Sequence, residues 1–189
     1  MKKYDVIIVG AGPAGIFASY ELAIKAPEYS VLLIEKGRDI YKRSCPILKK
    51  TLSKCPPPNK QREFASCTPA CSITNGFGGA GAYSDGKFNI TTEFGGWLDE
   101  YLPKEELMEL INYVDSIYVR FGGTKEIYGT EDEKIRELQR KAATADLRLI
   151  PAKLKHLGTE TCAKILKNMK DYLEQKVQIK TNTEVIKLI

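Results

Sequence analysis

The beginning of the chain places two short apolar runs on either side of a helical pattern. Residues 4–9 are dominated by β-branched side chains, which is typical of a strand buried on both faces of a parallel sheet. A helical stretch runs to about Lys25, Pro27 ends it, and residues 31–35 form a second apolar run. A crossover of this length makes the two strands parallel, so the pattern predicts an α/β fold that starts with a βαβ unit. The helix should bury Ile16, Ser19, Tyr20 and Ala23.

Three further helices are predicted in the second half of the chain. The first spans residues 103–121, the second starts at a capping box formed by Thr130 and Glu133, and the third spans residues 159–175. Residues 177–186 alternate in polarity and predict a strand. The apolar positions that should face the core from these helices are Leu107, Leu110, Val114, Ile117, Phe121, Ile135, Leu138, Ala142, Cys162, Leu166, Met169 and Leu173.

Between these two regions the hydrophobic pattern fades, and glycine, proline and four of the five cysteines gather. A flexible linker would not need so many cysteines and aromatic residues, so we expect a structured excursion. We therefore predict one domain, an α/β fold with a parallel sheet and a largely helical insertion. A strand that ends so close to the last residue lacks its expected partners, and we expect the domain to be incomplete. The segments are the βαβ unit at 1–44, the cysteine- and glycine-rich excursion at 45–96, the helical segment at 97–150, and the final helix and return strand at 151–189.

The composition adds a cellular setting and excludes two classes of partner. With 43% hydrophobic and 28% charged residues, the chain resembles a soluble globular protein, and no apolar run approaches the roughly 20 residues of a membrane span. Lys2 and Lys3 lead into a strand interrupted by Asp5, which is not a signal peptide, so we expect a cytoplasmic protein without a membrane partner. The net charge of +5 is dispersed along the chain, which argues against nucleic acid as a partner.

A glycine-rich corner joins the first strand to the first helix. Gly10, Gly12 and Gly15 follow the strand directly, and Glu35 ends the next strand about 20 residues later, as in a dinucleotide-binding fingerprint. Gly10 allows the sharp turn, Gly12 lets a pyrophosphate approach the backbone, and Gly15 lets the helix pack close to the strand. The helix start favours phosphate, and the Glu35 carboxylate can accept both ribose hydroxyls and repel a 2′-phosphate. The corner predicts a site for the ADP part of a dinucleotide.

The fingerprint alone does not distinguish NAD from FAD, because both contain ADP. A second glycine cluster at residues 76–87 is too rich in glycine for a core element. A backbone this bare is expected where a large flat ring or a second phosphate contact comes close. The cluster therefore favours FAD.

Four motifs occur together: Asp-Val-Ile-Ile-Val-Gly-Ala-Gly-Pro-Ala-Gly at 5–15, Ile-Glu-Lys-Gly-Arg at 34–38, Gly-Gly-Ala-Gly-Ala-Tyr-Ser-Asp-Gly-Lys at 78–87, and Leu-Gly-Thr-Glu at 157–160. Together they resemble the amino-terminal part of bacterial FAD-dependent dehydrogenases, over nearly the whole chain. The resemblance implies a Rossmann-type domain of a flavin-dependent oxidoreductase that moves hydride or electrons through FAD. It also implies further residues, which would carry the rest of the flavin site and a substrate domain.

The resemblance further implies which residues bind FAD. The fingerprint and Glu35 would contact its ADP part, the region from Arg38 to Arg43 and the loop at 79–87 its pyrophosphate and flavin, and the backbone of Val185 its adenine. The substrate would be an unidentified small molecule, with NAD(P)H as a candidate electron donor. The implied cofactor-binding residues are Gly10, Ala11, Gly12, Pro13, Ala14, Gly15, Glu35, Lys36, Arg43, Gly79, Ala80, Gly81, Ser84, Asp85, Gly86, Lys87 and Val185.

Two other functions stay open on the sequence. An NAD(P)-binding Rossmann enzyme could use the same fingerprint, and it predicts tight NADH binding without flavin. A truncated, non-catalytic remnant would bind nucleotide or a partner without turning anything over, and the abrupt end of the chain favours it. The pattern does not specify an oligomeric state.

Four clustered cysteines raise the question of a metal or redox site. In a cytosolic protein, such clustering favours metal binding or redox chemistry over structural disulfides. Cys67 and Cys71 have three residues between them, within the range of zinc sites, but Cys45 and Cys55 have nine. We therefore predict no metal, with these four as weak candidates, and a redox-active pair or plain packing as the other interpretations.

The single histidine and the single tryptophan are the last residues with candidate chemistry. His156 is the only histidine, so a general acid or base of this type would have to be this residue. A lone histidine ahead of a helix is more often a surface or capping residue, and the catalytic residues stay unknown. Trp97 follows two glycines and is most simply a packing anchor.

Overall fold

The computed structural model describes residues 2–187 of the 189-residue chain. Within this range the chain forms two compact units, one of residues 2–84 with 162–187 and the other of Asp85–Thr161. The first unit contains a parallel three-stranded sheet, and the second contains a two-stranded antiparallel sheet with two complete α-helices. Among the described helices, none combines the length and the apolar character that a bilayer crossing requires.

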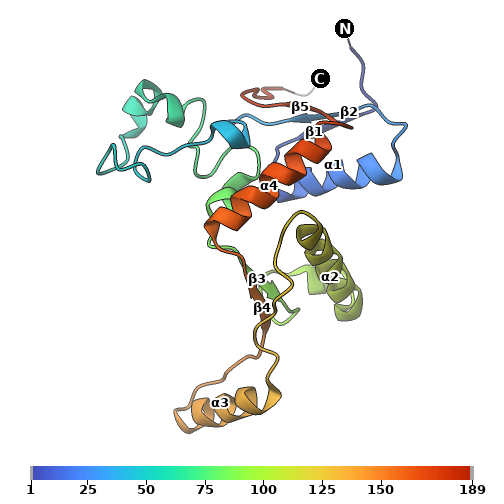
Figure 1. Ribbon diagram of the computed structural model, residues 1–189, viewed down its shortest axis with the longest axis vertical. Helices are drawn as coiled ribbons and strands as arrows, with labels where there is room; N and C mark the ends of the chain where they lie inside the picture. Colours follow the sequence, from blue (N-terminus) through green and yellow to red (C-terminus); the bar gives the residue numbers. More distant parts are fainter. Residues whose placement is uncertain (1, 188–189) are drawn as a thin grey trace. The chain divides into compact units, whose positions relative to one another are not determined.

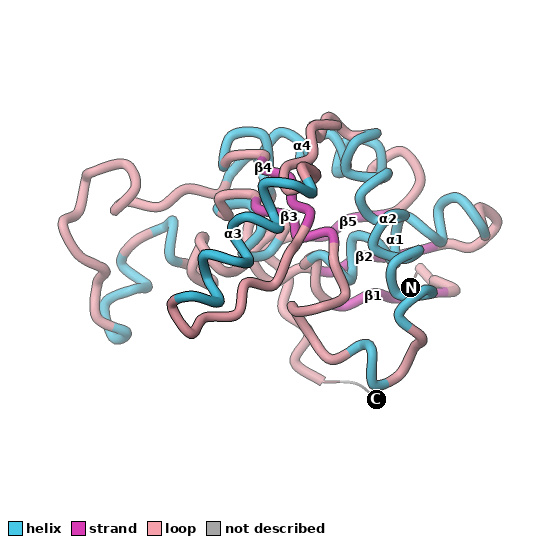
Figure 2. The backbone as a smooth tube through the Cα atoms, turned by 90° about the horizontal axis from the view of Figure 1, so that it is seen from below, coloured by secondary structure: helices cyan, strands magenta, loops and turns pink. Residues whose placement is uncertain are grey.

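The sheet of the first unit combines strands from both ends of the chain. β1 (Val6–Val9), β2 (Val31–Ile34) and β5 (Gln178–Lys180) lie side by side in this order (Figure 2). Both neighbouring pairs are parallel, so β2 is the central strand. The predicted βαβ start is confirmed, and β5 extends the sheet beyond β2.

Between β1 and β2, the helix α1 (Pro13–Lys25) starts and ends where its sequence dictates. Proline stands at the first helical position, where its missing N–H would have no partner and its fixed φ is already helical. Lys25 lies in the last turn, at the negative end of the helix dipole, and Pro27 follows shortly. The residues that α1 buries are the four expected ones, Ile16, Ser19, Tyr20 and Ala23.

A second helix, α4 (Thr159–Leu173), lies on the same side of the sheet as α1 (Figure 1). The rings of Tyr20 on α1 and Tyr172 on α4 are 5.8 Å apart between centroids, so the two helices are in contact. Met169 and Leu173 have no exposed surface, as expected for the apolar stripe of this helix. The buried face consists of Cys162, Ile165, Leu166, Met169, Lys170 and Leu173.

The edge strand β1 is exposed on its face away from α1, which corrects one prediction, whereas Val31, Leu32 and Leu33 of the central strand β2 are all buried, so β2 is covered on both faces. Residues 4–9 were expected to form a strand buried on both faces, yet Ile7 is 56% and Val9 is 58% exposed. Ile8 faces α1, because its side chain lies 3.3 Å from the position that a Cβ atom on Gly15 would take. The prediction is wrong because both helices cover one face, so alternate residues of this edge strand point away from them.

The last strand is shorter than predicted. The alternating pattern suggested a strand over 177–186, but β5 ends at Lys180. Asn182 adopts a positive φ of 51° and donates its N–H to the Gly37 carbonyl, and the Thr183 N–H donates to the Glu35 carbonyl. The chain therefore turns after Lys180 and passes the end of β2. The carbonyl groups of Glu35 and Gly37 accept the hydrogen bonds that a neighbouring strand would otherwise accept.

The cysteine- and glycine-rich excursion is structured, as expected, but mainly by short 3₁₀ helices and turns. Such turns are tight and seldom extend beyond a few residues. The strand β3 (Lys87–Ile90), which was not predicted, directly follows the second glycine cluster. Among residues 2–187, the 3₁₀ helices are η1 (Ile40–Lys42), η2 (Pro58–Glu63), η3 (Ala65–Cys67), η4 (Gly79–Tyr83) and η5 (Leu98–Glu100).

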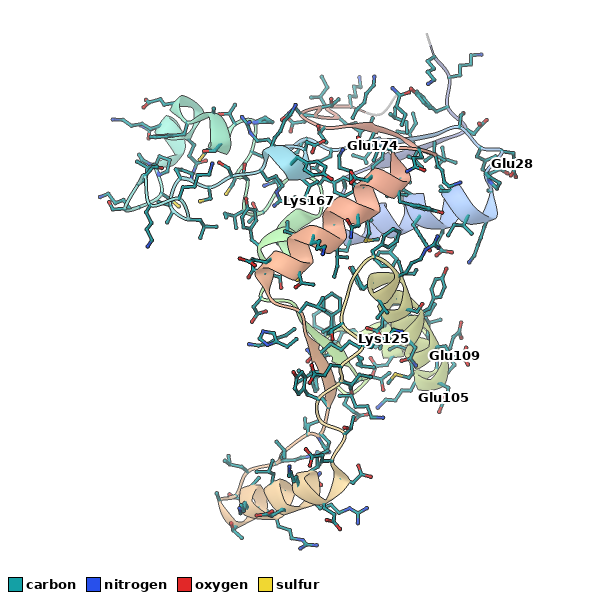
Figure 3. All side chains as sticks on the ribbon, in the orientation of Figure 1. Glu28, Glu105, Glu109, Lys125, Lys167 and Glu174 are labelled. Carbon is teal, nitrogen blue, oxygen red and sulfur yellow. The ribbon has the colours of Figure 1, made fainter. Side chains whose placement is uncertain are left out.

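The second unit is built around β3, which pairs antiparallel with β4 (Lys153–His156). The helix α2 (Lys104–Arg120) packs on β3, where the rings of Phe88 and Tyr118 meet edge to face at 4.7 Å. The charged side chains Glu105 and Glu109 lie along the exposed side of α2 (Figure 3).

The buried cation of this unit belongs to β4. Lys155 is 4% exposed, and its ammonium group lies 2.6 Å from the Asp115 carboxylate on α2. The strand β4 was not predicted from its sequence, because three of its four residues are basic and it lacks the alternation of apolar residues that indicates a strand.

Three predictions for the second unit are wrong. The helix α3 (Asp132–Thr144) has no side-chain cap, so Thr130 and Glu133 do not form a capping box, and none of its residues is buried. Leu110 and Leu138, both expected in the core, are 45% and 54% exposed. Trp97 is 78% exposed and is not a packing anchor. The unit offers too little packed surface to bury every apolar side chain that its helices present.

Candidate functional site

A cavity of about 420 Å³ lies at the carboxyl end of β1 and β2 in the first unit. This edge of a parallel sheet, where the strand order of α/β proteins leaves a crevice, is the usual ligand position in such folds. Segments distant in sequence meet there: the glycine corner, the end of β2, the turn before the second glycine cluster, and the chain after β5. The lining residues are Val9, Gly10, Gly12, Ile34, Glu35, Lys36, Thr74, Asn75, Gly76, Gly79, Thr183, Glu184 and Val185.

The three glycines of the corner differ in their surroundings. Gly10 has a φ of +99°, which other residues rarely adopt, and its N–H donates to the Ile34 carbonyl at 2.7 Å. A Cβ atom on Gly15 would overlap the carbonyl oxygen of Gly10, so α1 can approach the corner only without a side chain there. A Cβ atom on Gly12 would meet nothing within 4 Å. Gly12 therefore borders open space, which is what a bound group needs.

The start of α1 has neither a capping side chain nor an acidic neighbour in its first turn. The N-cap residue is Gly12. The first amides of a helix and its dipole attract a negative group, and nothing in the chain's own first turn compensates them. This arrangement suits a phosphate.

The Glu35 carboxylate is buried beside the corner and connects three segments. The residue is 7% exposed. Its Oε2 atom accepts from the Ala11 N–H at 2.8 Å, and Oε1 accepts from the Gly37 N–H at 2.7 Å and the Gly76 N–H at 3.0 Å. A carboxylate offers about four acceptor positions, so capacity is left for a hydroxyl group of a ligand. The ribose role of Glu35 stays a prediction, and its three backbone contacts were not predicted from the sequence.

The second glycine cluster packs against the first by backbone contact. Gly76, Gly78 and Gly79 all have positive φ values, of 114°, 92° and 56°. The Gly78 N–H donates to the Ala11 carbonyl at 2.8 Å, and a Cβ atom on Gly79 would lie 3.4 Å from the Gly12 Cα atom. The bare backbone thus serves the approach of one glycine segment to the other, a use that the sequence had not suggested.

The structure gathers part of the predicted cofactor-binding set around the cavity. The predicted residues that line it are Gly10, Gly12, Glu35, Lys36, Gly79 and Val185. The predicted residues of the first unit that do not line it are Ala11, Pro13, Ala14, Gly15, Arg43, Ala80, Gly81 and Ser84. Asp85, Gly86 and Lys87 belong to the second unit, where the carboxylate of Asp85 forms an ion pair with Lys87 at 2.9 Å.

Several lining residues were missed by the sequence. Thr74 and Asn75 come directly before Gly76 and Thr183 and Glu184 directly before Val185. Their positions beside predicted residues were the available signal. The turns that bring them to the cavity depend on contacts with residues 35–37, which no local pattern reveals.

Behind the cavity, Arg43 is 9% exposed, and burial lowers the pKa of its guanidinium. The ring centroid of Tyr83 lies 5.1 Å from the guanidinium carbon of Arg43, and burial raises the pKa of the Tyr83 phenol. The segment that leads to Arg43 is fixed from the other side by a polar network.

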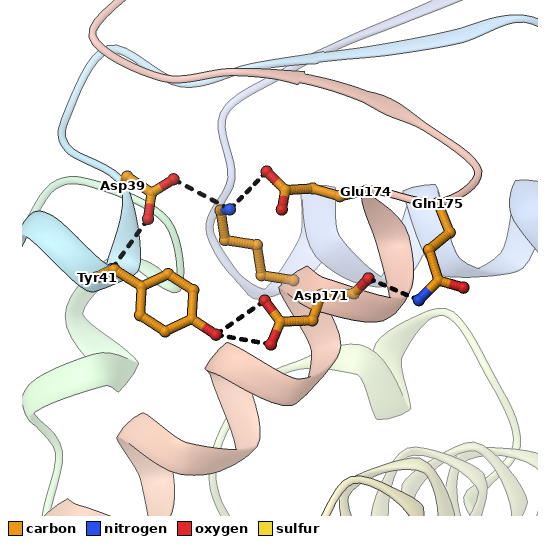
Figure 4. A network of polar contacts seen from close by, with 6 residues as sticks. Asp39, Tyr41, Asp171, Glu174 and Gln175 are labelled. Atoms are coloured by element: carbon orange, nitrogen blue, oxygen red, sulfur yellow. Dashed lines mark hydrogen bonds and ion pairs between the residues drawn. The ribbon is translucent and has the colours of Figure 1, made fainter.

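In this network, Lys170 of α4 is 4% exposed at its side chain and lies 3.1 Å from Asp39 and 2.5 Å from Glu174 (Figure 4). Burial lowers the pKa of Lys170, but the two carboxylates outweigh it and the net shift is upward. The Tyr41 hydroxyl donates to the Asp171 carboxylate, which raises the pKa of Tyr41. The network ties the turn after β2 to α4.

The cysteines of the excursion are free thiols. Cys55 and Cys71 are exposed, and Cys45 and Cys67 are partly buried. Over residues 2–187, no three His, Cys, Asp or Glu side chains are grouped as metal ligands would be. The weak metal hypothesis for these cysteines therefore has no support.

His156 lies on β4, is exposed, and stands opposite Lys87 of β3 in the strand register. Its role as a general acid or base stays a prediction.

A larger cavity, of about 680 Å³, lies within the second unit between α2, α3 and the β3-β4 pair. Its lining includes Asn112, Asp132, Arg136 and Lys153. The start of α3 at this cavity already carries acidic residues in its first turn, unlike the start of α1. Despite its smaller volume, the cavity at the glycine corner is therefore the better anion site.

Comparisons with known proteins agree with the geometry of the corner. Residues 8–41 match the family described as NAD(P)-binding Rossmann-like domain. An uncharacterized protein of Methanosarcina barkeri is 58% identical over 36 residues, which are 19% of this chain and 9% of that protein. The βαβ unit is thus Rossmann-like in both sequence and structure, and the chain has an α/β fold.

Solved structures give a weaker likeness. The L-amino acid deaminase of Proteus myxofaciens, in complex with anthranilate, matches 96% of this chain and 39% of its own length, with 17% identity and a TM-score of 0.30. The L-amino acid deaminase of Proteus vulgaris matches 96% and 40%, with 18% identity and a TM-score of 0.30. The chain spans less than half the length of each of these proteins. Similarity at this level carries no residue role or reaction over to this chain.

Proposed function

We propose that the chain binds the ADP part of FAD and supplies the cofactor-binding part of a flavin-dependent oxidoreductase. One observation carries the proposal: the uncapped start of α1 and the buried Glu35 carboxylate border the same cavity. A dinucleotide has a diphosphate next to a ribose. The start of α1 complements the diphosphate, and the Glu35 carboxylate complements the ribose.

The diphosphate would lie at the start of α1. The space beside Gly12 is open, and the first-turn amides have no acidic neighbour in their own turn. Charge interactions of this kind contribute about 0.3–1 kcal/mol each at exposed sites. The anion is therefore held by backbone groups, which any phosphate-bearing dinucleotide can use.

The ribose and the adenine would occupy the rest of the cavity. Glu35 keeps acceptor capacity beyond its three amide contacts, and a carboxylate at this position disfavours a 2′-phosphate. Thr183 and Val185 line the cavity beyond Glu35, which suits the predicted contact of the Val185 backbone with the adenine.

The choice of FAD rests on the sequence motifs and on the second glycine segment beside the corner. When bound, the isoalloxazine ring of FAD supplies hydride or electron transfer. The residues of this chain would hold its ADP part and orient the ring. The substrate, the catalytic residues and the use of NAD(P)H as electron donor remain proposals of the same kind.

NAD is the second candidate ligand. The observation that favours it is the match of residues 8–41 to an NAD(P)-binding Rossmann-like domain. Glu35 makes NAD a better candidate than NADP, because its carboxylate would face the additional phosphate.

A single substitution tests the proposal. In Gly12→Ala, the new methyl group would enter the open space of the cavity and meet no protein atom within 4 Å. We expect the free energy of unfolding to change by about 1 kcal/mol or less, the scale of a helix N-cap substitution. FAD affinity, measured by equilibrium dialysis, should fall at least about tenfold, because the methyl group occupies the place of the diphosphate.

The wild-type protein is titrated in parallel with FAD, NAD and NADP. Saturable binding of NAD without binding of FAD would replace the first candidate by the second. Folded wild-type protein that binds neither dinucleotide at millimolar concentration, or Gly12→Ala protein that binds FAD as tightly as the wild type, would contradict the proposal.

A further inference from the structure

Arg43 carries a buried charge that the cavity does not use directly. Its guanidinium donates from Nε and Nη2 to the Ser72 carbonyl at 2.9 and 2.8 Å, from Nη2 to the Ile73 carbonyl at 3.0 Å, and from Nη1 to the Phe77 carbonyl at 2.8 Å. Four of the five N–H groups are therefore occupied by backbone carbonyl oxygens. Burial of a charge is costly unless hydrogen bonds compensate it, so this residue is committed to the segment that supplies those carbonyls.

That segment, residues 72–77, forms one wall of the cavity. It contains no helix or strand, and its residues Thr74, Asn75 and Gly76 line the cavity. A planar guanidinium with several fixed donors can hold three carbonyl groups in one arrangement, which a flexible ammonium group does less well. The guanidinium thus replaces the regular hydrogen bonding that the segment lacks.

The same segment fixes the Glu35 carboxylate. The Gly76 N–H donates to Glu35 Oε1 at 3.0 Å. Arg43 packs directly beneath this glycine, since a Cβ atom on Gly76 would lie 2.9 Å from Arg43 Cδ and 3.0 Å from its Nε atom. A contact chain therefore runs from the guanidinium through the backbone of Gly76 to the carboxylate.

We infer that Arg43 is a positioning residue for the ribose-binding carboxylate: it holds the 72–77 segment so that the Gly76 amide orients Glu35, without touching the dinucleotide. The inference rests on the proposed function and replaces the expected direct contact between Arg43 and the cofactor. It predicts that loss of Arg43 impairs recognition of the ribose more than recognition of the phosphates.

Two nucleotides that differ by one hydroxyl group test this. Wild-type protein is expected to bind ADP at least about tenfold more tightly than 2′-deoxy-ADP, the discrimination of one hydrogen bond to a charged acceptor. In Arg43→Met, this preference should fall below about threefold. Arg43→Lys keeps the charge without the planar fork and should retain part of the preference.

Arg38 offers a matched control. Its guanidinium also donates to backbone carbonyls, those of Thr68 and Ala65, but neither residue lines the cavity. Arg38→Met removes the same chemistry from a neighbouring segment and should keep the tenfold preference. Both dissociation constants are measured by isothermal titration calorimetry at constant salt, with unfolding monitored in parallel.

The outcomes separate the inference from the proposed function. If Arg43→Met weakens both nucleotides by the same factor and keeps the preference, Arg43 acts through the phosphates or the fold as a whole, and the inference is overturned while the function stands. If Arg43→Met does not fold, an undiminished preference in Arg43→Lys overturns the inference. Wild-type protein that binds neither nucleotide overturns both.

Discussion

The two walls of the cavity are held by different forces. One wall, formed by β1, the glycine corner and Glu35 at the end of β2, belongs to a parallel sheet packed on α1. The other, residues 72–77, has no regular structure and depends on Arg43 from one side and on Glu35 from the other. Apolar packing and strand pairing therefore fix the wall that is the proposed diphosphate site, and charged side chains bonded to backbone groups fix the other wall.

This difference predicts which kind of substitution should destabilise each wall. A densely packed corner is destabilised when an atom is added, because the surrounding backbone cannot move aside without strain. A wall without regular structure is destabilised when a charged side chain is removed, because the backbone groups that were bonded to that side chain are left buried without hydrogen bonds.

The largest effect is expected from Gly15→Ala, which adds one methyl group to the packed wall. The new atom would overlap the Gly10 carbonyl oxygen, so α1 has to move away from β1. We expect the free energy of unfolding to fall by about 3 kcal/mol, the upper end of the cost of overpacking, as measured by urea unfolding. Gly12→Ala adds the same atom to open space, and an equal loss of stability in both variants would contradict the account of the corner.

Lys170→Met is expected to have an intermediate effect, since it removes the cation that ties the turn after β2 to α4. Asp39 and Glu174 lose their partner, and Asp39 is 19% exposed at its side chain. We expect a loss of about 2 kcal/mol at neutral pH, below the 3–5 kcal/mol of fully buried pairs, because solvent reaches both carboxylates.

The pH dependence of this variant checks the cause. The pKa of Lys170 is raised in the folded protein, so its contribution is complete below its ordinary pKa of about 10.4 and is lost as the pH rises through the raised value. The difference in stability between wild type and Lys170→Met should therefore shrink as the pH rises above the ordinary lysine pKa of about 10.4. A difference that stays constant would point to packing of the lysine chain as the cause.

The smallest effect is expected from Asp5→Asn at the beginning of the packed wall. The Asp5 carboxylate accepts from the Ser30 hydroxyl at 2.6 Å and from the Ser30 N–H at 2.8 Å, which lowers the pKa of Asp5. Its contribution is present above its ordinary pKa of about 3.9 and is lost as the pH falls through the lowered value. Thermal unfolding should show a slightly less stable variant at pH 7, and the difference should shrink at acid pH, below the ordinary aspartate pKa of about 3.9. A difference of the same size at neutral and acid pH would assign the effect to geometry.

The same contrast explains what the sequence could predict. The packed wall follows from local patterns: the strand that leads into the glycine corner, the helix after the corner and the buried face of α1 were predicted and are confirmed. These features depend on residues a few positions apart. The fold class followed from them.

The irregular wall could not be predicted, because its partners lie far apart in sequence. Gly76 contacts Glu35 across 41 positions, and Arg43 reaches Phe77 across 34. The predictions that Ile7 would be buried and that Trp97 would be a packing anchor were also wrong. A hydrophobic pattern shows which side chains would gain from burial, but it does not show whether the fold supplies other residues to cover them. The strand β4 escaped prediction for the opposite reason, as its basic residues carry no apolar alternation.

One measurement tests the central claim most directly: amide chemical shifts of ¹⁵N-labelled protein titrated with FAD. If the dinucleotide lies at the glycine corner, the amides of Gly10, Ala11, Gly12 and Gly76 should shift together and saturate with one dissociation constant. FAD that leaves these four amides unchanged at saturation, or that shifts only residues away from the corner, would contradict the claim.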